Sequence, residues 1–228
     1  MYHFDLAHAH LVARRSGALF WPDHAMLIVS DLHFGKSERI ARRGGVLLPP
    51  YETRATLARL EAELSATAAR QVVCLGDSFD DLAASSEMHE DDLQWLARLM
   101  AGRDWNWIEG NHDAGPTPIK GNHRAEMAVG GIILRHIASK ENNEISGHYH
   151  PKAKLAGRAR PCFLIDATRV ILPAFGTYTG GLWADDPTLA AVMAPDAIAV
   201  LTGNHALPVP LGKIGRSQTK PRASSLSR

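Results

Sequence analysis

Residues 25–33 read Ala-Met-Leu-Ile-Val-Ser-Asp-Leu-His, an apolar run that ends in residue types able to bind a metal ion. The apolar part, residues 25–29, predicts a β-strand. Two similar apolar runs follow at residues 71–75 and 105–108. We therefore expect three strands in the first half of the chain, the first of them ending in polar side chains.

Helical patterns lie between these strands. In each pattern, apolar residues recur at a spacing that places them on one face of a helix. These residues are Leu57, Leu60 and Leu64 in the first pattern, and Leu93, Leu96 and Met100 in the second. Gly102 marks the end of the second helix. Strands that alternate with helices indicate an α/β architecture.

The second half of the chain is richer in strand signals and has few clear helices between them. The predicted strands are Gly131–Leu134, Glu144–Ser146, Cys162–Ile165, Val170–Leu172 and Ala197–Leu201. Strands that follow one another without an intervening helix favour antiparallel pairing, so we expect a mixed sheet.

Composition is that of an ordinary globular protein. The 228 residues are 45% hydrophobic and 21% charged, with a formal net charge of +1. We expect a single domain over residues 1–212, followed by a basic, flexible tail over residues 213–228. A net charge so close to zero gives no bulk electrostatic signal for a nucleic-acid or membrane partner, so a partner must be argued from a site.

The cellular compartment is predicted from what the sequence lacks. Cys74 lies in an apolar run and Cys162 has no partner nearby in sequence, a usage that favours reduced thiols, although a disulfide between them stays open. No secretory signal is visible in the first 15 residues, and no apolar stretch reaches the roughly 18 residues of a membrane helix. We therefore expect a cytoplasmic protein without a membrane partner.

Five apolar segments end in metal-ligand residue types, and this is the main functional signal. The polar residues at these ends are Asp31 and His33, Asp77, Asn111 to Asp113, His136, and His148 and His150. The carboxyl ends of strands in an open α/β sheet line the ligand crevice, so these side chains can converge. Asp31 and His33 are two residues apart, as are His148 and His150. If the strand continues through them, each pair projects to one side.

Taken singly, each of these residues has an ordinary explanation. Asp31 suits a helix cap, His136 a core histidine and Asn111 a turn. Five such coincidences at strand ends favour a shared metal site instead. Gly76, Gly110 and Gly147 precede several of the ligand types, where a missing side chain permits a sharp turn and close approach of a substrate.

The triplet Gly-Asn-His occurs three times, at residues 110–112, 121–123 and 203–205. The second follows a Pro-rich segment that indicates a loop, and the third follows a predicted strand. On residue patterns alone the third competes with the first. Asp113 directly follows the first triplet and favours it.

In this order the motifs resemble the calcineurin-like metallophosphoesterase superfamily, whose pattern runs D-x-H, G-D, G-N-H-D/E, a lone H, then G-H-x-H. Longer stretches are similar to the bacterial ligase-associated DNA damage response endonuclease group. They include Phe20-Trp21-Pro22, residues 42–54, Gly76-Asp77-Ser78-Phe79 and Gly147-His148-Tyr149-His150-Pro151. The likeness runs from about Gly17 to Tyr178. It implies two mixed β-sheets packed as a sandwich and flanked by helices, a four-layer αββα fold.

The resemblance also implies a role for each matching residue. Asp31, His33, Asp77 and His150 would hold one metal ion, and Asp77, Asn111, His136 and His148 a second, so that Asp77 bridges the two. His112 would lie beside the substrate phosphate as a catalytic residue, and Asp113 would orient it. Asp80 and Asp81 depart from the expected pattern, and solvated helix capping is our interpretation of both.

The ligand chemistry indicates a phosphoesterase. Two divalent ions with two carboxylates and neutral ligands keep a net positive charge even with a metal-bridging hydroxide, which suits attack on an anionic phosphodiester. His112 is the predicted general acid or charge stabiliser. Mixed imidazole and oxygen ligands favour Mn, with Fe or Zn as alternatives.

The sequence indicates the type of bond that is hydrolysed, a phosphodiester, more clearly than it indicates the substrate. Resemblance favours DNA, in a repair nuclease with a DNA ligase or nuclease as partner. A small-molecule or cyclic-nucleotide phosphodiesterase is the alternative, and a non-catalytic protein-binding scaffold of the same fold is the weaker rival. Arg39, Arg42 and Arg43 could bind substrate, although a solvated face is the commoner role of such a cluster. Trp21, Trp105 and Trp107 could stack bases but suit the core better.

Overall fold

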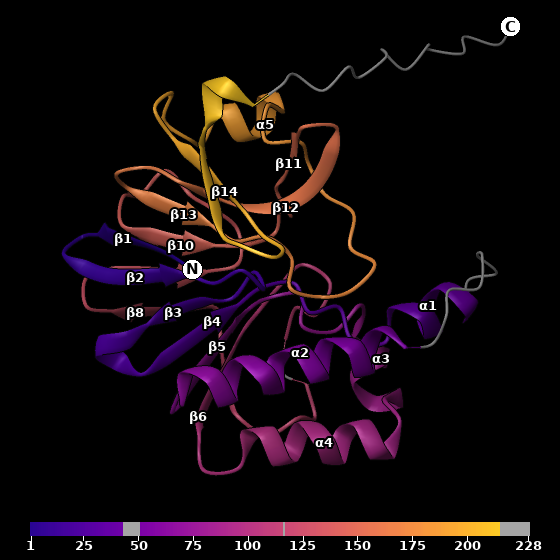
Figure 1. Cartoon of the computed structure of the whole chain (residues 1–228). Helices are drawn as coiled ribbons and strands as arrows, with labels where there is room; N and C mark the ends of the chain where they lie inside the picture. The colour runs from indigo at the N-terminus through magenta and orange to yellow at the C-terminus, as the bar shows by residue number, and fades with distance from the viewer. Residues whose placement is uncertain (43–50, 116, 215–228) are drawn as a thin grey trace, which may run out of the picture.

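The protein is described here from a computed structural model that places residues 1–42, 51–115 and 117–214. Two β-sheets pack face to face, with helices on the outside, as Figure 1 shows. The predicted α/β sandwich of two mixed sheets is confirmed.

The first sheet has seven strands in the order β1-β2-β3-β4-β5-β6-β7. Its strands are β1 (Tyr2–Leu6), β2 (Ala9–Ala13), β3 (Leu19–Trp21), β4 (Met26–Val29), β5 (Gln71–Leu75), β6 (Asp104–Ile108) and β7 (Asn122–Arg124). Pairing is antiparallel from β1 to β4 and parallel from β4 to β7. The parallel half brings the carboxyl ends of β4, β5 and β6 to one edge.

The second sheet has eight strands in the order β15-β14-β12-β13-β10-β9-β8, and β11 pairs with β12 outside this path. Its strands are β8 (Glu126–Val129), β9 (Ile132–Arg135), β10 (Glu144–Ser146), β11 (Lys152–Leu155), β12 (Arg158–Ile165), β13 (Arg169–Ile171), β14 (Ile198–Leu201) and β15 (Leu207–Pro210). β9, β10 and β13 are parallel, and the other pairs are antiparallel.

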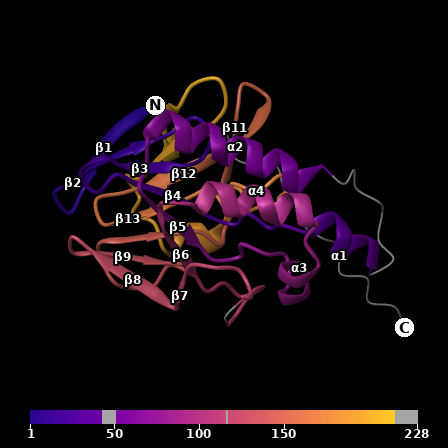
Figure 2. The ribbon, with the colours of Figure 1, turned by 90° about the horizontal axis from the view of Figure 1, so that it is seen from below.

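The helices form two unequal outer layers. They are α1 (Lys36–Arg42), α2 (Glu52–Thr67), α3 (Leu82–Glu87), α4 (Glu90–Met100) and α5 (Pro187–Ala190), with short 3-10 turns at Pro22–His24 and Leu211–Lys213. Figure 2 shows α2 and α4 side by side across the first sheet, whereas α5 is the small helix at the opposite side in Figure 1. The helical layer on the outer side of the second sheet is therefore much smaller than the layer on the first sheet. Within the described ranges, no helix is both long and apolar enough to cross a lipid bilayer.

Alternation along β4 explains why the sandwich holds together. Met26 and Ile28 belong to the apolar core between the two sheets, while Leu27 and Val29 belong to the core beneath the helices. Successive side chains of a strand point to opposite faces, so this strand is buried on both sides. The leucines of α2 cover the outer face of β4, and they lie on one face of the helix as the sequence pattern predicted.

Several details differ from the sequence expectations. The described residues before the second Gly-Asn-His triplet, 117–120, form a loop as expected, but Asn122 and His123 of the triplet begin the strand β7, which pairs with β6. Trp107 of β6 donates its indole N–H to the carbonyl of Lys120 and holds this loop. The tryptophans expected in the core are buried there. Ile214 packs into the third core cluster, so the folded part extends beyond residue 212, and residues 215–228 lie outside the described part. Both cysteines are free and buried.

Candidate metal centre

The polar strand ends meet at one edge of the sandwich. Asp31 follows β4, Asp77 follows β5, and Asn111 to Asp113 follow β6, while His136, His148 and His150 follow β9 and β10 of the second sheet. Backbone hydrogen bonds tie the first two ends together: the amides of Asp31 and His33 donate to the carbonyls of Gly76 and Asp77. The amide of His148 donates to Asp31 Oδ2 at 3.0 Å and joins the second sheet to them.

The backbone at these residues is not extended. φ is +53° at Asp31, +48° at His33, +46° at Asp77, +70° at His148 and +45° at His150. Our expectation that a continuing strand aims each pair to one side is therefore wrong. The chain enters left-handed turns, which are rare for non-glycine residues and cluster at functional sites.

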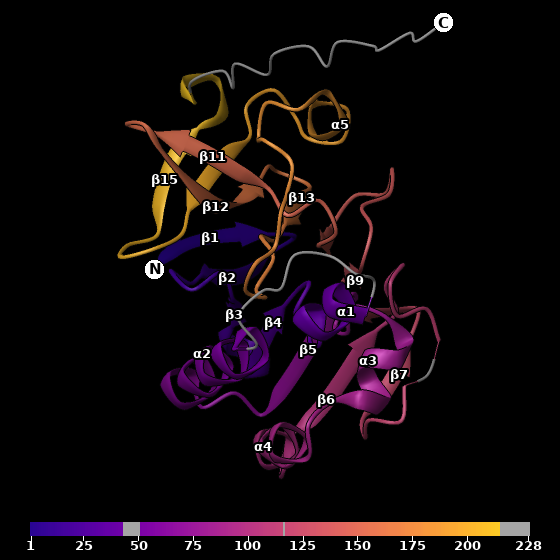
Figure 3. The same cartoon turned by 90° about the vertical axis from the view of Figure 1, so that its right-hand side faces the viewer.

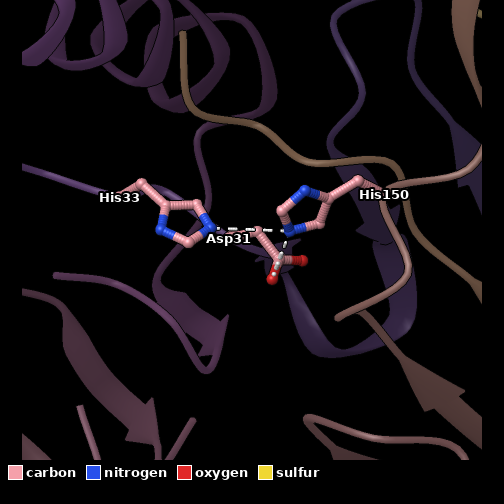
Figure 4. A group of neighbouring side chains, drawn as sticks. All are labelled: Asp31, His33 and His150. Carbon is pink, nitrogen blue, oxygen red and sulfur yellow. Dashed lines mark hydrogen bonds and ion pairs between the residues drawn. The ribbon is translucent and has the colours of Figure 1, made fainter. Parts of the chain in front are cut away.

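Asp31, His33 and His150 form one group of converging side chains, which Figure 4 shows. His150 Nε2 lies 2.9 Å from Asp31 Oδ1 and 3.5 Å from His33 Nε2. His150 Nδ1 lies 3.1 Å from the carbonyl oxygen of Gly180, so Nδ1 carries the proton. Nε2 therefore faces the carboxylate of Asp31 and is the nitrogen available to a metal ion when the ring is neutral.

Asp77, His136 and His148 form a second group, with Asn111 beside it. His136 Nδ1 lies 2.7 Å from the carbonyl oxygen of Leu75 and so carries the proton. Its Nε2 then faces three atoms. These are Asn111 Oδ1 at 3.0 Å, His148 Nδ1 at 3.2 Å and Asp77 Oδ2 at 3.4 Å.

The donor sets of both groups fit a cation. In each group a histidine nitrogen lies within 3.4 Å of a carboxylate oxygen, a contact that either a proton on the nitrogen or a metal ion shared by both groups stabilises. Asp31 Oδ1 is fully buried and has no hydrogen-bond partner among the described residues, although His150 Nε2 is only 2.9 Å away. A buried orphan acceptor of this kind is costly unless it is paired or coordinates a metal. Imidazole nitrogens and carboxylate oxygens suit transition metals.

Electrostatics favours the charged form of both carboxylates. Burial acts to raise the pKa of Asp77, but the hydrogen bond and charge of His136 outweigh it and hold that pKa well below its usual range. Burial also acts to raise the pKa of Asp31, and His150 and His136 overcome it. Burial lowers the pKa of His148, and the neighbouring His136 lowers it further. Burial also acts to lower the pKa of His136, but the hydrogen bond to Asp77 and the nearby carboxylate charges overcome it and raise that pKa. Metal binding requires charged carboxylates and neutral imidazoles, so a metal ion at His136 would displace a proton.

His112 lies at the mouth of this cluster. Its ring Nδ1 is 2.9 Å from the carbonyl oxygen of Asp80, and its Nε2 is 4.0 Å from Asp77 Oδ2. Its backbone amide donates to Asp77 Oδ1 at 2.9 Å. The side chain is 36% exposed, so Nε2 can meet a substrate while the ring stays fixed at Nδ1.

Asp113 does not orient His112 as the resemblance implies. Its carboxylate accepts backbone N–H groups of Asp77, Ser78, Phe79 and Gly110 at 2.8–3.2 Å. The ring of His112 is fixed by the carbonyl of Asp80 instead. Asp113 therefore shapes the turn that presents Asp77.

Asp80 is the residue whose position the sequence interpretation missed. It is 1% exposed rather than solvated. Its Oδ1 lies 2.9 Å from His33 Nδ1 and 4.0 Å from Lys36 Nζ, and its Oδ2 pairs with Arg39. A carboxylate on the far nitrogen of a ligand histidine fixes ring orientation and raises ligand basicity. Asp81, by contrast, caps α3 by accepting the amide of Ala84, as predicted.

The three arginines considered for substrate binding have different outcomes. Arg39 is engaged by Asp80 in a part-buried ion pair and not presented as a free cation. Arg42 ends α1, and Arg43 lies outside the described residues. Figure 3 shows α1 and α3 at the face of the molecule that carries this edge.

The glycines serve packing between loops rather than substrate approach. A Cβ atom on Gly110 would clash with the backbone of Asp77, and one on Gly147 would clash with Ser30 Oγ. A Cβ atom on Gly76, where φ is +77°, would lie 2.5 Å from His136 Nδ1. Because these glycines have no side chain, the loops of the two sheets can approach one another closely.

The competing triplets lie away from this cluster. The ring of His123 contacts the carbonyl of Ile119, and the side chain of Asn122 donates to Asp104 at the other end of β6. The segment at residues 203–205 is exposed and contacts Arg15. Only the first of the three triplets adjoins Asp77 in the described structure.

Comparison with protein-family models gives no match, and comparison with curated proteins gives none. Among solved structures, the chain is similar to the nuclease MPE of Pseudomonas putida, with 28% sequence identity and a TM-score of 0.73. The match covers 91% of this chain and 99% of that chain. The fold of this chain is thus that of a nuclease over most of its length, which indicates a hydrolytic enzyme.

Proposed function

We propose that this chain is a dinuclear-metal phosphoesterase that hydrolyses phosphodiester bonds in nucleic acid. The observation that carries the proposal is the pair of adjacent groups in which histidine ring nitrogens converge on buried carboxylates. Asp31, His33 and His150 would hold one ion, and Asn111, His136 and His148 the other, with Asp77 bridging. When bound, two divalent cations supply positive charge and activate water for in-line displacement.

The residues around the cluster would position the metal ligands and act on the substrate. Asp80 holds the ring of His33, and Asp113 holds the turn that carries Asp77. His112 donates its Nδ1–H to the carbonyl of Asp80, and its imidazolium form would carry a second N–H at Nε2 that would stabilise the phosphate and pass its proton to the leaving oxygen, which would leave the ring neutral.

Nucleic acid is the substrate class that the similar structure supports, since that protein is a nuclease. We further propose Mn as the metal because nitrogen and oxygen ligands are mixed. From the resemblance we propose a cytoplasmic DNA-repair role with a ligase or nuclease partner.

Purified protein assayed with Mn²⁺ tests the proposal. We expect cleavage of plasmid and single-stranded DNA that a chelator abolishes and that rising salt suppresses. Hydrolysis confined to bis(p-nitrophenyl) phosphate would favour the small-ester alternative. Absence of hydrolysis of every phosphodiester, with Fe²⁺ and Zn²⁺ included, would contradict the phosphoesterase itself.

A further inference from the structure

A hairpin next to the metal centre is unusually basic for this chain. It comprises β11 and the start of β12, residues 152–160, with the sequence Lys-Ala-Lys-Leu-Ala-Gly-Arg-Ala-Arg. We call it the basic hairpin. It carries four cations and no acidic residue, although the whole chain has a net charge of only +1.

The basic hairpin is joined directly to the candidate ligands. Lys152 lies two residues after His150, and the two residues line a pocket of about 150 Å³ together with Arg160 and Thr179. Among the described residues that line this pocket, none is a carboxylate. A positively charged pocket therefore opens beside the first candidate metal group.

The cations of the basic hairpin are available to bind an anion. In the described part of the chain, no acidic side chain forms an ion pair with Lys152, Lys154, Arg158 or Arg160, whereas Arg39 is paired with Asp80. Lys152 Nζ lies 4.8 Å from the centroid of the Trp183 ring, which positions the ammonium group without neutralising it. Lys154 and Arg158 are exposed.

The spacing suits an extended polyanion. Residues i and i+2 of a strand lie on one side, about 7 Å apart, so Lys152 and Lys154 form a row that leads away from His150. In the antiparallel register Arg160 pairs with Ala153 and Arg158 pairs with Leu155, so these two arginines lie on the opposite face of the hairpin from the row of Lys152 and Lys154. Figure 1 shows β11 and β12 together on the second sheet, away from α2 and α4.

We propose that the basic hairpin binds the backbone phosphates of the polynucleotide that flank the scissile bond. This inference rests on the proposed function and names the surface that recognises its substrate. Phosphate contacts from Lys and Arg supply most sequence-independent affinity for nucleic acid. The row of Lys152 and Lys154, which no acidic side chain of the described residues neutralises, explains how a nearly neutral protein holds a polyanion.

The size of the effect follows from counterion release. Each phosphate contact on a single strand contributes a salt exponent of about 0.7, which at 0.1 M salt is about a fivefold gain in affinity. Two lost contacts therefore cost about 25-fold, and the slope of log affinity against log salt falls by about 1.4.

The test compares two double charge reversals. Lys152→Glu/Lys154→Glu reverses the two cations of the row, and Arg70→Glu/Arg98→Glu changes net charge equally at two exposed positions outside the hairpin. With Mn²⁺ at 0.1 M salt, kcat/KM is measured for a fluorescein-labelled oligodeoxynucleotide and for bis(p-nitrophenyl) phosphate. We expect the ratio of the two values to fall about 25-fold in the hairpin variant, mainly through KM for the oligonucleotide, and to stay at the wild-type value in the control.

The outcomes of this test distinguish failure of the inference about the hairpin from failure of the proposed function. An unchanged ratio in the hairpin variant, with wild-type protein cleaving both substrates, overturns the inference and leaves the proposed function standing. Wild-type protein that hydrolyses only the small ester overturns the nucleic-acid substrate and the inference together. Thermal unfolding checks that the variants are folded. Lys152→Gln/Lys154→Gln repeats the measurement without added negative charge, and its ratio must fall as well.

Discussion

Asp80 offers a sharp test of how the centre is held, because a neighbouring aspartate serves as its control. Asp80→Asn keeps the shape of the side chain and removes a buried negative charge that faces His33, Arg39 and Lys36. Asp81→Asn makes the same change at the cap of α3, where asparagine caps as well as aspartate does.

The expected magnitude follows from these contacts. Losing the carboxylate that orients a ligand histidine costs roughly 10- to 100-fold in metal affinity, which is about 1.4–2.7 kcal/mol. Leaving buried cations unpaired costs about 3–5 kcal/mol, and since the side chains of Arg39 and Lys36 keep 18% and 16% exposure, we expect a loss of about 2–3 kcal/mol in unfolding free energy.

Calorimetric titration of chelator-treated protein with MnCl₂ measures the first quantity, and urea unfolding measures the second. We expect Asp80→Asn to weaken one binding event and leave the other near its wild-type affinity, because Asp80 contacts His33 and not the side chains of the second group. Asp81→Asn should match wild type in both assays. Wild-type Mn²⁺ affinity in Asp80→Asn would refute the claim that this carboxylate supports a metal ligand.

Three further predictions follow. His112→Ala should retain both metal ions by elemental analysis and lose about 100- to 10,000-fold in kcat; near-normal turnover would exclude His112 as proton donor. Asp77→Asn should lower the occupancy of both ions, and full occupancy of either would argue against a bridge. Burial raises the pKa of Cys162 to about 12, so folding favours the neutral thiol and the stabilisation is lost as pH rises from about 9 toward 12. Between pH 8 and pH 10, wild type should therefore lose about 1.4 kcal/mol more unfolding free energy than Cys162→Ala, and equal losses would contradict this.

The parts of the fold that sequence patterns predicted are those buried on both sides. β4, β5 and β10 are continuous apolar or wholly buried segments, and α2 has one regular stripe of leucines. β1 alternates between partly buried and exposed side chains, and β7 and β8 are largely exposed. Such strands are fixed by pairing with a neighbour, which a pattern within one segment does not record.

The candidate site also has features that the sequence predicted and features that it did not. Its residue types were visible at strand ends, and the structure brings those residues together. The left-handed turns at Asp31 and Asp77 were not visible, because they depend on hydrogen bonds between loops far apart in sequence. Burial of Asp80 depends on His33 and Arg39, more than 40 residues away, and no local signal distinguishes it from Asp81.

Anomalous diffraction from crystals grown with Mn²⁺ tests the central claim most directly. We predict two anomalous peaks, one among Asp31, His33 and His150 and one among Asp77, Asn111, His136 and His148, with an oxygen of Asp77 in contact with both. Peaks confined to other surfaces of the protein, with both clusters empty at saturating Mn²⁺, would contradict the account.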